Sequence, residues 1–288
     1  MNAGATSQAR AARVRDERVD DDEANANDNP TDGAAPHGPD GRGPDIYGPD
    51  IYTEPDVDPD TLANLGPLAP LAGIWEGTTG ADEHPESYGT GRDVFLERYE
   101  AQPIDGQTNG PQLFYGLRYH THIVEPGKVE TFHDQVGYWL WEPAAETVVM
   151  TLGIPRGQVL LAGGSVAPDA TEFELHAAVG SETYGIVSNP FLDRAFRTTS
   201  YRIHVQVHPD GTWSYEEEGI MEIPGRDEPF HHIDRNTLHR VAAPTPNPTA
   251  LAAAAQGTSG TQGAHDPLDG SLRIGSLRGI PQQGSVLE

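Results

Sequence analysis

Two short stretches decide the fold of this chain: LAPLAGIWEG at residues 68–77 and FHDQVGYW at residues 132–139. The first reads as a short apolar helix, limited to one or two turns by Pro70, that runs into a strand beginning Gly-x-Trp-x-Gly. The second reads as a strand that carries His133 two residues before Gln135 and four before Gly137. This spacing by itself predicts an all-β domain with histidines on its strands.

Strand signals recur around these stretches, separated by tight turns rich in Gly, Pro, Asp and Asn. Sequential strands joined by short turns form a meander, and closing the meander removes its exposed edges. The pattern therefore predicts an all-β, ten-stranded antiparallel up-and-down β-barrel with a short N-terminal helical plug. The ten strands are expected at 73–79, 91–102, 112–125, 129–142, 147–154, 157–166, 171–179, 195–207, 211–223 and 231–241.

The composition is uneven along the 288 residues. Residues 1–60 hold 15 acidic residues and 5 arginines, and residues 244–288 are rich in Ala, Gly, Ser and Gln. Such segments cannot bury enough apolar surface to offset the entropy of ordering them. The predicted organisation is a disordered acidic tail over 1–60, a barrel domain over 61–243 and a second disordered tail over 244–288.

Charge and residue usage exclude several classes of function. A net charge of −26 argues against nucleic acid and anionic membrane as partners, because both need a basic face. The absence of cysteine excludes disulfides, thiolate nucleophiles and cysteine-ligated metal or haem. No apolar run resembles the core of a signal peptide or a membrane span of about 18 residues. A soluble cytoplasmic protein is expected.

Two later segments extend the pattern: DGTWSY at residues 210–215 and PFHHIDRNTL at residues 229–238. Together with residues 68–77 and 132–139 they resemble the nitrobindin family, small barrels of the fatty-acid-binding-protein type that hold ferric haem and react with nitrogen oxides. The segment 78–85, read as a loop, and the loops at 103–111 and 180–194 are longer than in compact nitrobindins. The chain is therefore interpreted as a divergent, extended branch.

The resemblance also implies site residues. The family's closing strand supplies the histidine that binds the haem iron, and a one-residue insertion leaves His231 and His232 both eligible. Adjacent residues of a strand point to opposite faces, so only one of the two can enter the barrel. His232 is expected as the iron ligand, because an apolar residue follows it as in the family, and His231 is the alternative. His133 is expected on the distal side as the catalytic group, with Trp75 and Ile154 against the cofactor.

The implied cofactor is one ferric haem b per chain, and the implied ligand is a small nitrogen oxide. The implied reaction is the isomerisation of peroxynitrite to nitrate. A homodimer is a further partnership that the sequence leaves open.

Two other classes of function stay open from the residues alone. A barrel without haem could carry a lipophile whose carboxylate meets Arg118, Arg156 or Arg202. A cupin-like enzyme could bind non-haem iron or manganese through His120, His122 and a late histidine, since residues at i and i+2 of a strand share a face.

Overall fold

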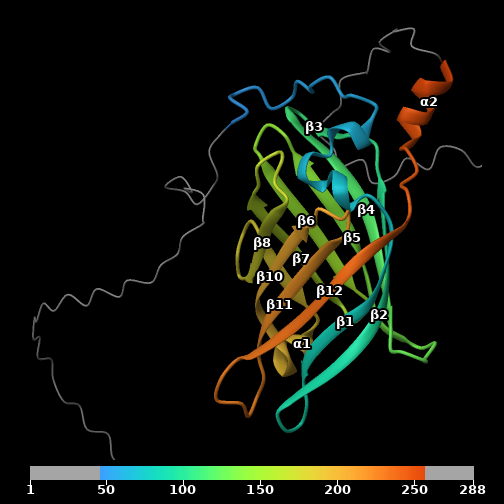
Figure 1. Cartoon of the computed structure of the whole chain (residues 1–288). Helices are drawn as coiled ribbons and strands as arrows, with labels where there is room; N and C mark the ends of the chain where they lie inside the picture. Colours follow the sequence, from blue (N-terminus) through green and yellow to red (C-terminus); the bar gives the residue numbers. More distant parts are fainter. Residues whose placement is uncertain (1–45, 257–288) are drawn as a thin grey trace, which may run out of the picture. The chain divides into compact units, whose positions relative to one another are not determined.

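The computed structural model describes residues 46–256, which form an all-β domain closed into a barrel (Figure 1). Its strands are β1 (Gly73–Pro85), β2 (Thr90–Pro103), β3 (Gln107–Asn109), β4 (Gln112–Val124), β5 (Thr131–Glu142), β6 (Thr147–Ile154), β7 (Gln158–Ser165), β8 (Glu172–Val179), β9 (Gly185–Ser188), β10 (Arg197–Val207), β11 (Trp213–Glu222) and β12 (Phe230–Ala242).

Strand pairing closes the sheet in the order β2-β1-β12-β11-β10-β8-β9-β7-β6-β5-β4, with β4 returning to pair with β2. The short β3 pairs only with β4 and lies outside this ring. The barrel is confirmed, but its count is eleven strands plus one outside, where the sequence predicted ten. The extra barrel strand is β9, which the segment after β8 contributes, and it pairs with β8 in parallel.

The ends of the other strands agree with the prediction to within a few residues, and β1 differs most. It was expected to stop at residue 79 and instead continues to Pro85, paired with β2 as far as Thr90 and with β12 as far as Ile233. Residues 78–85 are polar and contain Gly80 and Pro85, a pattern typical of a loop. In the structure the neighbouring strands β2 and β12 supply hydrogen-bond partners for the backbone of this segment. The extension brings Asp82 and His84 onto the barrel wall.

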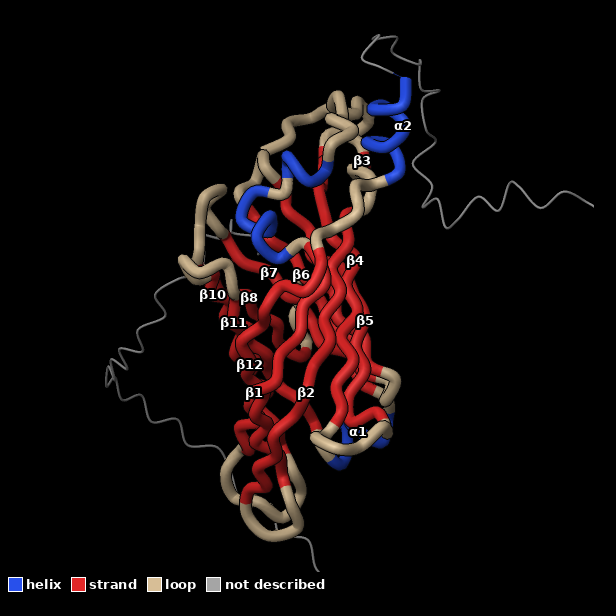
Figure 2. The backbone as a smooth tube through the Cα atoms, turned by 45° about the vertical axis from the view of Figure 1, so that its right-hand side comes forward, coloured by secondary structure: helices blue, strands red, loops and turns tan. Residues whose placement is uncertain are grey.

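A helical plug covers one end of the barrel, as predicted. It consists of two 3₁₀ helices, η1 (Thr61–Asn64) and η2 (Gly66–Leu71), seen beside the strand ends in Figure 2. Leu65, Leu68 and Leu71 are fully buried there, and the indole N–H of Trp75 donates a hydrogen bond to the carbonyl of Leu71 at 2.8 Å. Helix η2 begins at Gly66 and contains Pro70, and these two residues keep the plug short.

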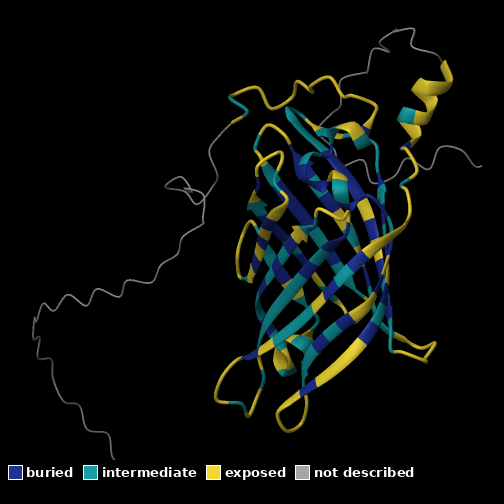
Figure 3. Cartoon of the chain, in the orientation of Figure 1, coloured by how far each residue is buried: buried dark blue, intermediate teal, exposed yellow. Residues whose placement is uncertain are grey.

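Buried and more exposed residues alternate along the strands (Figure 3). Because successive side chains of a strand point to opposite faces, the barrel has a buried inner face and a more exposed outer face. On β5 the inner face carries Gln135, Trp139 and Trp141, all buried. On β12 it carries Asn236 and Leu238, and Thr237 between them is more exposed. An aromatic layer crosses the interior: Tyr99 stacks on Tyr119 with ring centroids 5.4 Å apart, and the N–H of Trp139 donates to the Tyr99 hydroxyl.

Residues on both sides of the predicted 61–243 domain contact the barrel. The side-chain amide of Asn247 is buried, accepts a hydrogen bond from the Thr61 N–H and donates to Asp105, and helix α2 (Pro248–Gln256) follows it. Of the disordered tails predicted for 1–60 and 244–288, residues 1–45 and 257–288 lie outside the described residues. Within 46–256 no helix has the length and apolar character needed to cross a membrane.

Candidate functional site

A cavity of about 400 Å³ opens inside the barrel, away from the plug. This volume lies in the range of small-molecule and cofactor sites. The aromatic layer forms its floor through Tyr99, Trp139 and Trp213. Its rim includes helix α1 (Pro190–Ala195). The side chain of Asn189 caps the N-terminus of this helix and also donates a hydrogen bond to the carbonyl of Arg156. The apolar wall is formed by Phe132, Met150, Leu152, Ile154, Leu192 and Phe196.

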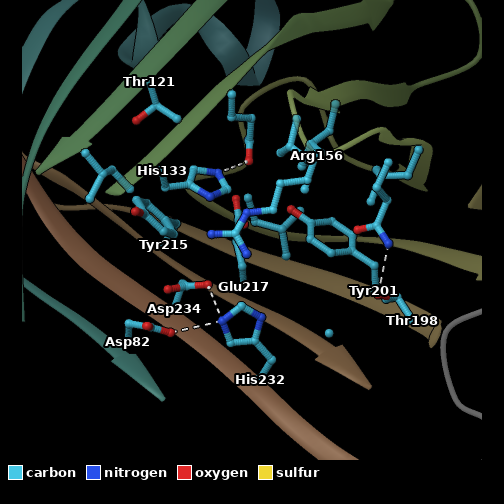
Figure 4. Close-up of a pocket in the computed structure, with 18 of the residues that line it drawn as sticks. Asp82, Thr121, His133, Arg156, Thr198, Tyr201, Tyr215, Glu217, His232 and Asp234 are labelled. Carbon is cyan, nitrogen blue, oxygen red and sulfur yellow. Dashed lines mark hydrogen bonds and ion pairs between the residues drawn. The ribbon is translucent and has the colours of Figure 1, made fainter. Parts of the chain in front are cut away.

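His232 of β12 lines this cavity, and its neighbour His231 does not. The alternation of β12 turns His231 outward, where its side chain is 57% exposed and its Nδ1 lies 2.7 Å from Glu218. The His232 side chain is 32% exposed and points into the barrel (Figure 4). The geometry therefore favours His232, the expected member of the pair, as the histidine available to a bound ligand.

The imidazole of His232 meets two carboxyl groups. Its Nε2 lies 2.9 Å from Oδ1 of Asp82 on β1 and 3.5 Å from Oδ2 of Asp234 on its own strand (Figure 4). The other oxygen of Asp82 lies 2.8 Å from Nδ1 of His84, so this buried carboxylate bridges two histidines. Burial opposes ionisation of Asp82, but hydrogen bonds from His232 and His84 outweigh it and lower the pKa of Asp82.

The same contacts raise the pKa of His232. Burial by itself favours the neutral imidazole, but the hydrogen bond to Asp82 and the charges of Asp234 and Asp82 outweigh it. The Nε2 atom of His232 therefore donates its proton to the Asp82 carboxylate, and this contact favours the protonated form of the imidazole.

Three acidic residues stand in one row across neighbouring strands. Asp82 of β1 is the cross-strand partner of Asp234, and Asp234 is the partner of Glu217 on β11. Burial raises the pKa of Asp234 to about 7 and that of Glu217 to about 8, with the nearby carboxylates adding to both shifts. Glu217 is therefore mostly protonated and Asp234 partly protonated near neutral pH, which reduces the repulsion that directly opposed like charges would otherwise produce.

His133 of β5 approaches the cavity from another wall (Figure 4). Its Nε2 lies 3.2 Å from the amide oxygen of Gln135, which in turn donates to the hydroxyl of Tyr119. Burial is the main cause of a lowered pKa for His133, and the charge of Arg156 adds to it. Burial thus favours the neutral imidazole of His133, and its pKa is shifted in the direction opposite to that of His232.

Arg156, in the turn between β6 and β7, directs its guanidinium toward the cavity between His133 and Glu217 (Figure 4). Among residues 46–256 this group has no side-chain hydrogen bond or ion pair, whereas Arg202 on the outer face contacts Glu174, Glu216 and Glu218. The cavity thus offers one free cation to an anionic ligand.

The remaining residues singled out in the sequence divide between the cavity and other places. Ile154 lines the cavity, but Trp75 does not: it packs edge-on against Trp213 at 6.1 Å and under Arg240, and serves the core beside the plug. His120 and His122 share a face as predicted, but it is the outer face, where they contact Asp134 and Thr131. The structure does not bring them together with His231 or His232, so the cupin-like ligand set is not assembled.

Sequence reasoning did not single out Asp82, Asp234 or Glu217. The usable signal was a pair of i, i+2 patterns, Asp82-x-His84 and His232-x-Asp234, each of which places its two side chains on one face of a strand. The first pattern was assigned to a loop. Neither pattern indicates by itself that the two strands are neighbours.

A match to a protein family agrees with this architecture. The family described as the THAP4-like, heme-binding beta-barrel domain matches residues 64–240. Among solved structures, that of Rv2717c from M. tuberculosis is 20% identical, with a TM-score of 0.41, covering 64% of this chain and 99% of that chain. A comparison with curated proteins gives no match. Since the family match spans more than half of the chain and confirms the nitrobindin resemblance, this protein belongs to the THAP4-like haem-binding β-barrel family.

Proposed function

We propose that this protein binds one ferric haem b per chain through His232 and that the bound haem reacts with nitrogen oxides, isomerising peroxynitrite to nitrate. The observation that carries the proposal is the position of His232 inside an apolar-walled cavity, with His133 on another wall, in a chain of a haem-binding family. With His232 as its single protein ligand, a bound haem would supply an iron that is still open to a small molecule.

The residues present meet three needs of a haem. His232 supplies an imidazole inside the barrel, Phe132, Ile154 and their neighbours supply apolar contact for the porphyrin, and Arg156 supplies an unpaired cation for a propionate. One condition comes with this fit. The Nε2 of His232 is hydrogen-bonded to Asp82, so iron coordination requires that the imidazole lose a proton and leave this carboxylate.

In the proposed reaction the haem supplies a Lewis-acidic iron, and the chain supplies orientation. Isomerisation of peroxynitrite to nitrate breaks an O–O bond and forms an N–O bond, with no atom gained or lost. Because burial favours the neutral imidazole of His133, this group serves as a hydrogen-bond partner that orients the anion. The apolar wall excludes water and keeps the fragments close enough to recombine at oxygen.

Titration of the purified full-length chain with hemin tests the binding step. We expect a Soret band that saturates at one haem per chain, is lost in His232→Ala, and persists in the matched control His231→Ala. Far-UV circular dichroism of each variant checks that the barrel is intact. A band that survives in His232→Ala and disappears in His231→Ala would assign the ligand to His231.

Stopped-flow decay of peroxynitrite tests the reaction in protein that absorbance shows to be fully haem-loaded. We expect accelerated decay with nitrate as the main product, and slower decay in His133→Ala. A decay rate equal to that of buffer would end the isomerase proposal. Absence of any hemin uptake would instead favour the carrier of a lipophilic anion, to which the unpaired guanidinium of Arg156 would bind.

A further inference from the structure

Asp82, His232 and Asp234 bring three potential metal-ligand atoms together at one side of the cavity. One atom from each residue lies within 4.8 Å of the other two. The two measured contacts from the His232 Nε2 are 2.9 Å to Asp82 and 3.5 Å to Asp234. Two ligands bound about 2.1 Å from one ion are separated by about 3.0 Å in octahedral and about 3.4 Å in tetrahedral geometry. The group therefore needs little rearrangement to surround an ion.

The backbone holds this arrangement in place. Asp82 and Asp234 are cross-strand partners in the β1–β12 pair, and His232 lies two residues from Asp234 on the same face. His84 is hydrogen-bonded to the second oxygen of Asp82 and so fixes the orientation of this carboxylate. A residue that hydrogen-bonds to a metal ligand, as His84 does to Asp82, typically contributes 10–100-fold to metal affinity.

The acidic side chains of the site offer oxygen atoms that a cation can bind in place of their protons. Two carboxyl groups face each other directly across the strand pair, and Glu217 stands next to them in the same row. In the part of the chain that the structure describes, the guanidinium of Arg156 makes no ion pair with any of the three. Directly opposed like charges destabilise a strand pair unless a proton or a cation lies between them.

From this geometry we infer that Asp82, His232 and Asp234 bind a divalent transition-metal ion when haem is absent, and that the ion and haem compete for the His232 Nε2. One imidazole with two carboxylates suits Zn²⁺, Mn²⁺ or Fe²⁺ and leaves positions open for water or a substrate oxygen. Mg²⁺ is a poor fit, because it prefers an all-oxygen octahedron and gives up its water reluctantly. This set is distinct from the outer-face His120 and His122.

Isothermal titration of the haem-free, chelator-treated full chain with Zn²⁺ tests the site. We expect one site per chain, at least tenfold weaker in Asp234→Asn and unchanged in the matched variant His231→Ala, with Mg²⁺ binding at least tenfold more weakly than Zn²⁺. Circular dichroism verifies the fold of each variant. Equal Zn²⁺ affinity in wild type and Asp234→Asn would overturn the inference, since the many surface carboxylates would then account for the binding.

A second measurement uses the wild-type chain alone, so that it does not depend on the folding of a variant. Diethyl pyrocarbonate modifies accessible imidazoles, and mass spectrometry assigns each adduct. We expect Zn²⁺ to protect His232 and to leave the exposed His231 reactive. Equal modification of His232 with and without Zn²⁺ would contradict the proposed ligand.

Competition separates this inference from the haem proposal. Protein saturated with Zn²⁺ should take up hemin with a reduced apparent affinity that EDTA restores. Zn²⁺ protection of His232 without any hemin uptake would support the metal site and refute the haem proposal. Hemin uptake that Zn²⁺ does not affect, with no Zn²⁺ protection of His232, would refute the metal site alone.

Discussion

Asp82 of β1 and Asp234 of β12 lie directly opposite each other in the barrel wall, although they are 152 residues apart in the sequence. His232 bonds to the first and approaches the second, which gives this wall of the cavity both its charge and its ligand atoms.

Replacing Asp82 by Asn should destabilise the barrel. Its carboxylate accepts hydrogen bonds from His84 through one oxygen and from His232 through the other. The Asn side chain has only one accepting oxygen, because its NH2 group donates, so it cannot replace both contacts. Loss of a buried, charge-assisted interaction typically costs about 1–3 kcal/mol. Urea unfolding at pH 7 measures the loss, and Asp93→Asn, whose partner His84 is 3.8 Å away, is the control. Equal stability of the two variants would show that the bridge contributes nothing.

Gly137→Ala should be severely destabilising. An added Cβ would lie 1.8 Å from the carbonyl oxygen of Thr151 on β6, a backbone atom that cannot move aside without breaking the strand pair. Overpacking in a core costs about 1–3 kcal/mol and occasionally more. Gly153→Ala on β6 is the matched control, because its nearest neighbour would be 3.7 Å away. Thermal unfolding compares the two, and an unchanged midpoint for Gly137→Ala would contradict the steric argument.

Glu142 should make stability depend on pH. Burial raises the pKa of its carboxyl from 4.5 to about 7, and its Oε1 has no hydrogen-bond partner among the described residues. Because the folded pKa exceeds the unfolded one, the contribution to stability is fully present below pH 4.5 and is lost as pH rises through 7. In Glu142→Gln we expect the fall in unfolding free energy between pH 5 and about pH 8.5 to shrink by on the order of 2 kcal/mol. Denaturant titrations across this interval measure it, and the exposed Glu182→Gln should retain the wild-type profile.

Arg156→Gln should weaken hemin binding while leaving the Soret maximum unchanged. The guanidinium is the free cation at the cavity, so its loss removes attraction for a propionate without touching the iron ligand. For a partly exposed charge pair we expect a loss of about 2–5-fold in affinity, corresponding to about 0.5–1 kcal/mol. Arg98→Gln, on the outer wall beside Glu76, is the control. A shifted Soret maximum would mean that Arg156 also affects the iron coordination.

Much of the fold follows from local sequence. Period-2 alternation and turn residues predicted ten of the twelve strands, and the apolar segment around Pro70 predicted the helical plug. Both signals depend only on residues that are neighbours in the sequence. The two short strands β3 and β9 were missed because they lie in the longer loops at 103–111 and 180–194, whose residues carry no clear alternation.

The sequence by itself determined that the chain forms a closed β-barrel, that His133 lies on one strand, and that one of two adjacent histidines enters the interior. Only the tertiary structure decided the rest of the site. Alternation defines two faces of a strand but not which faces inward, and it contains no information about register across the β1–β12 pair. That register places Asp82 beside His232, and it arises from the closure of the whole barrel rather than from any local pattern.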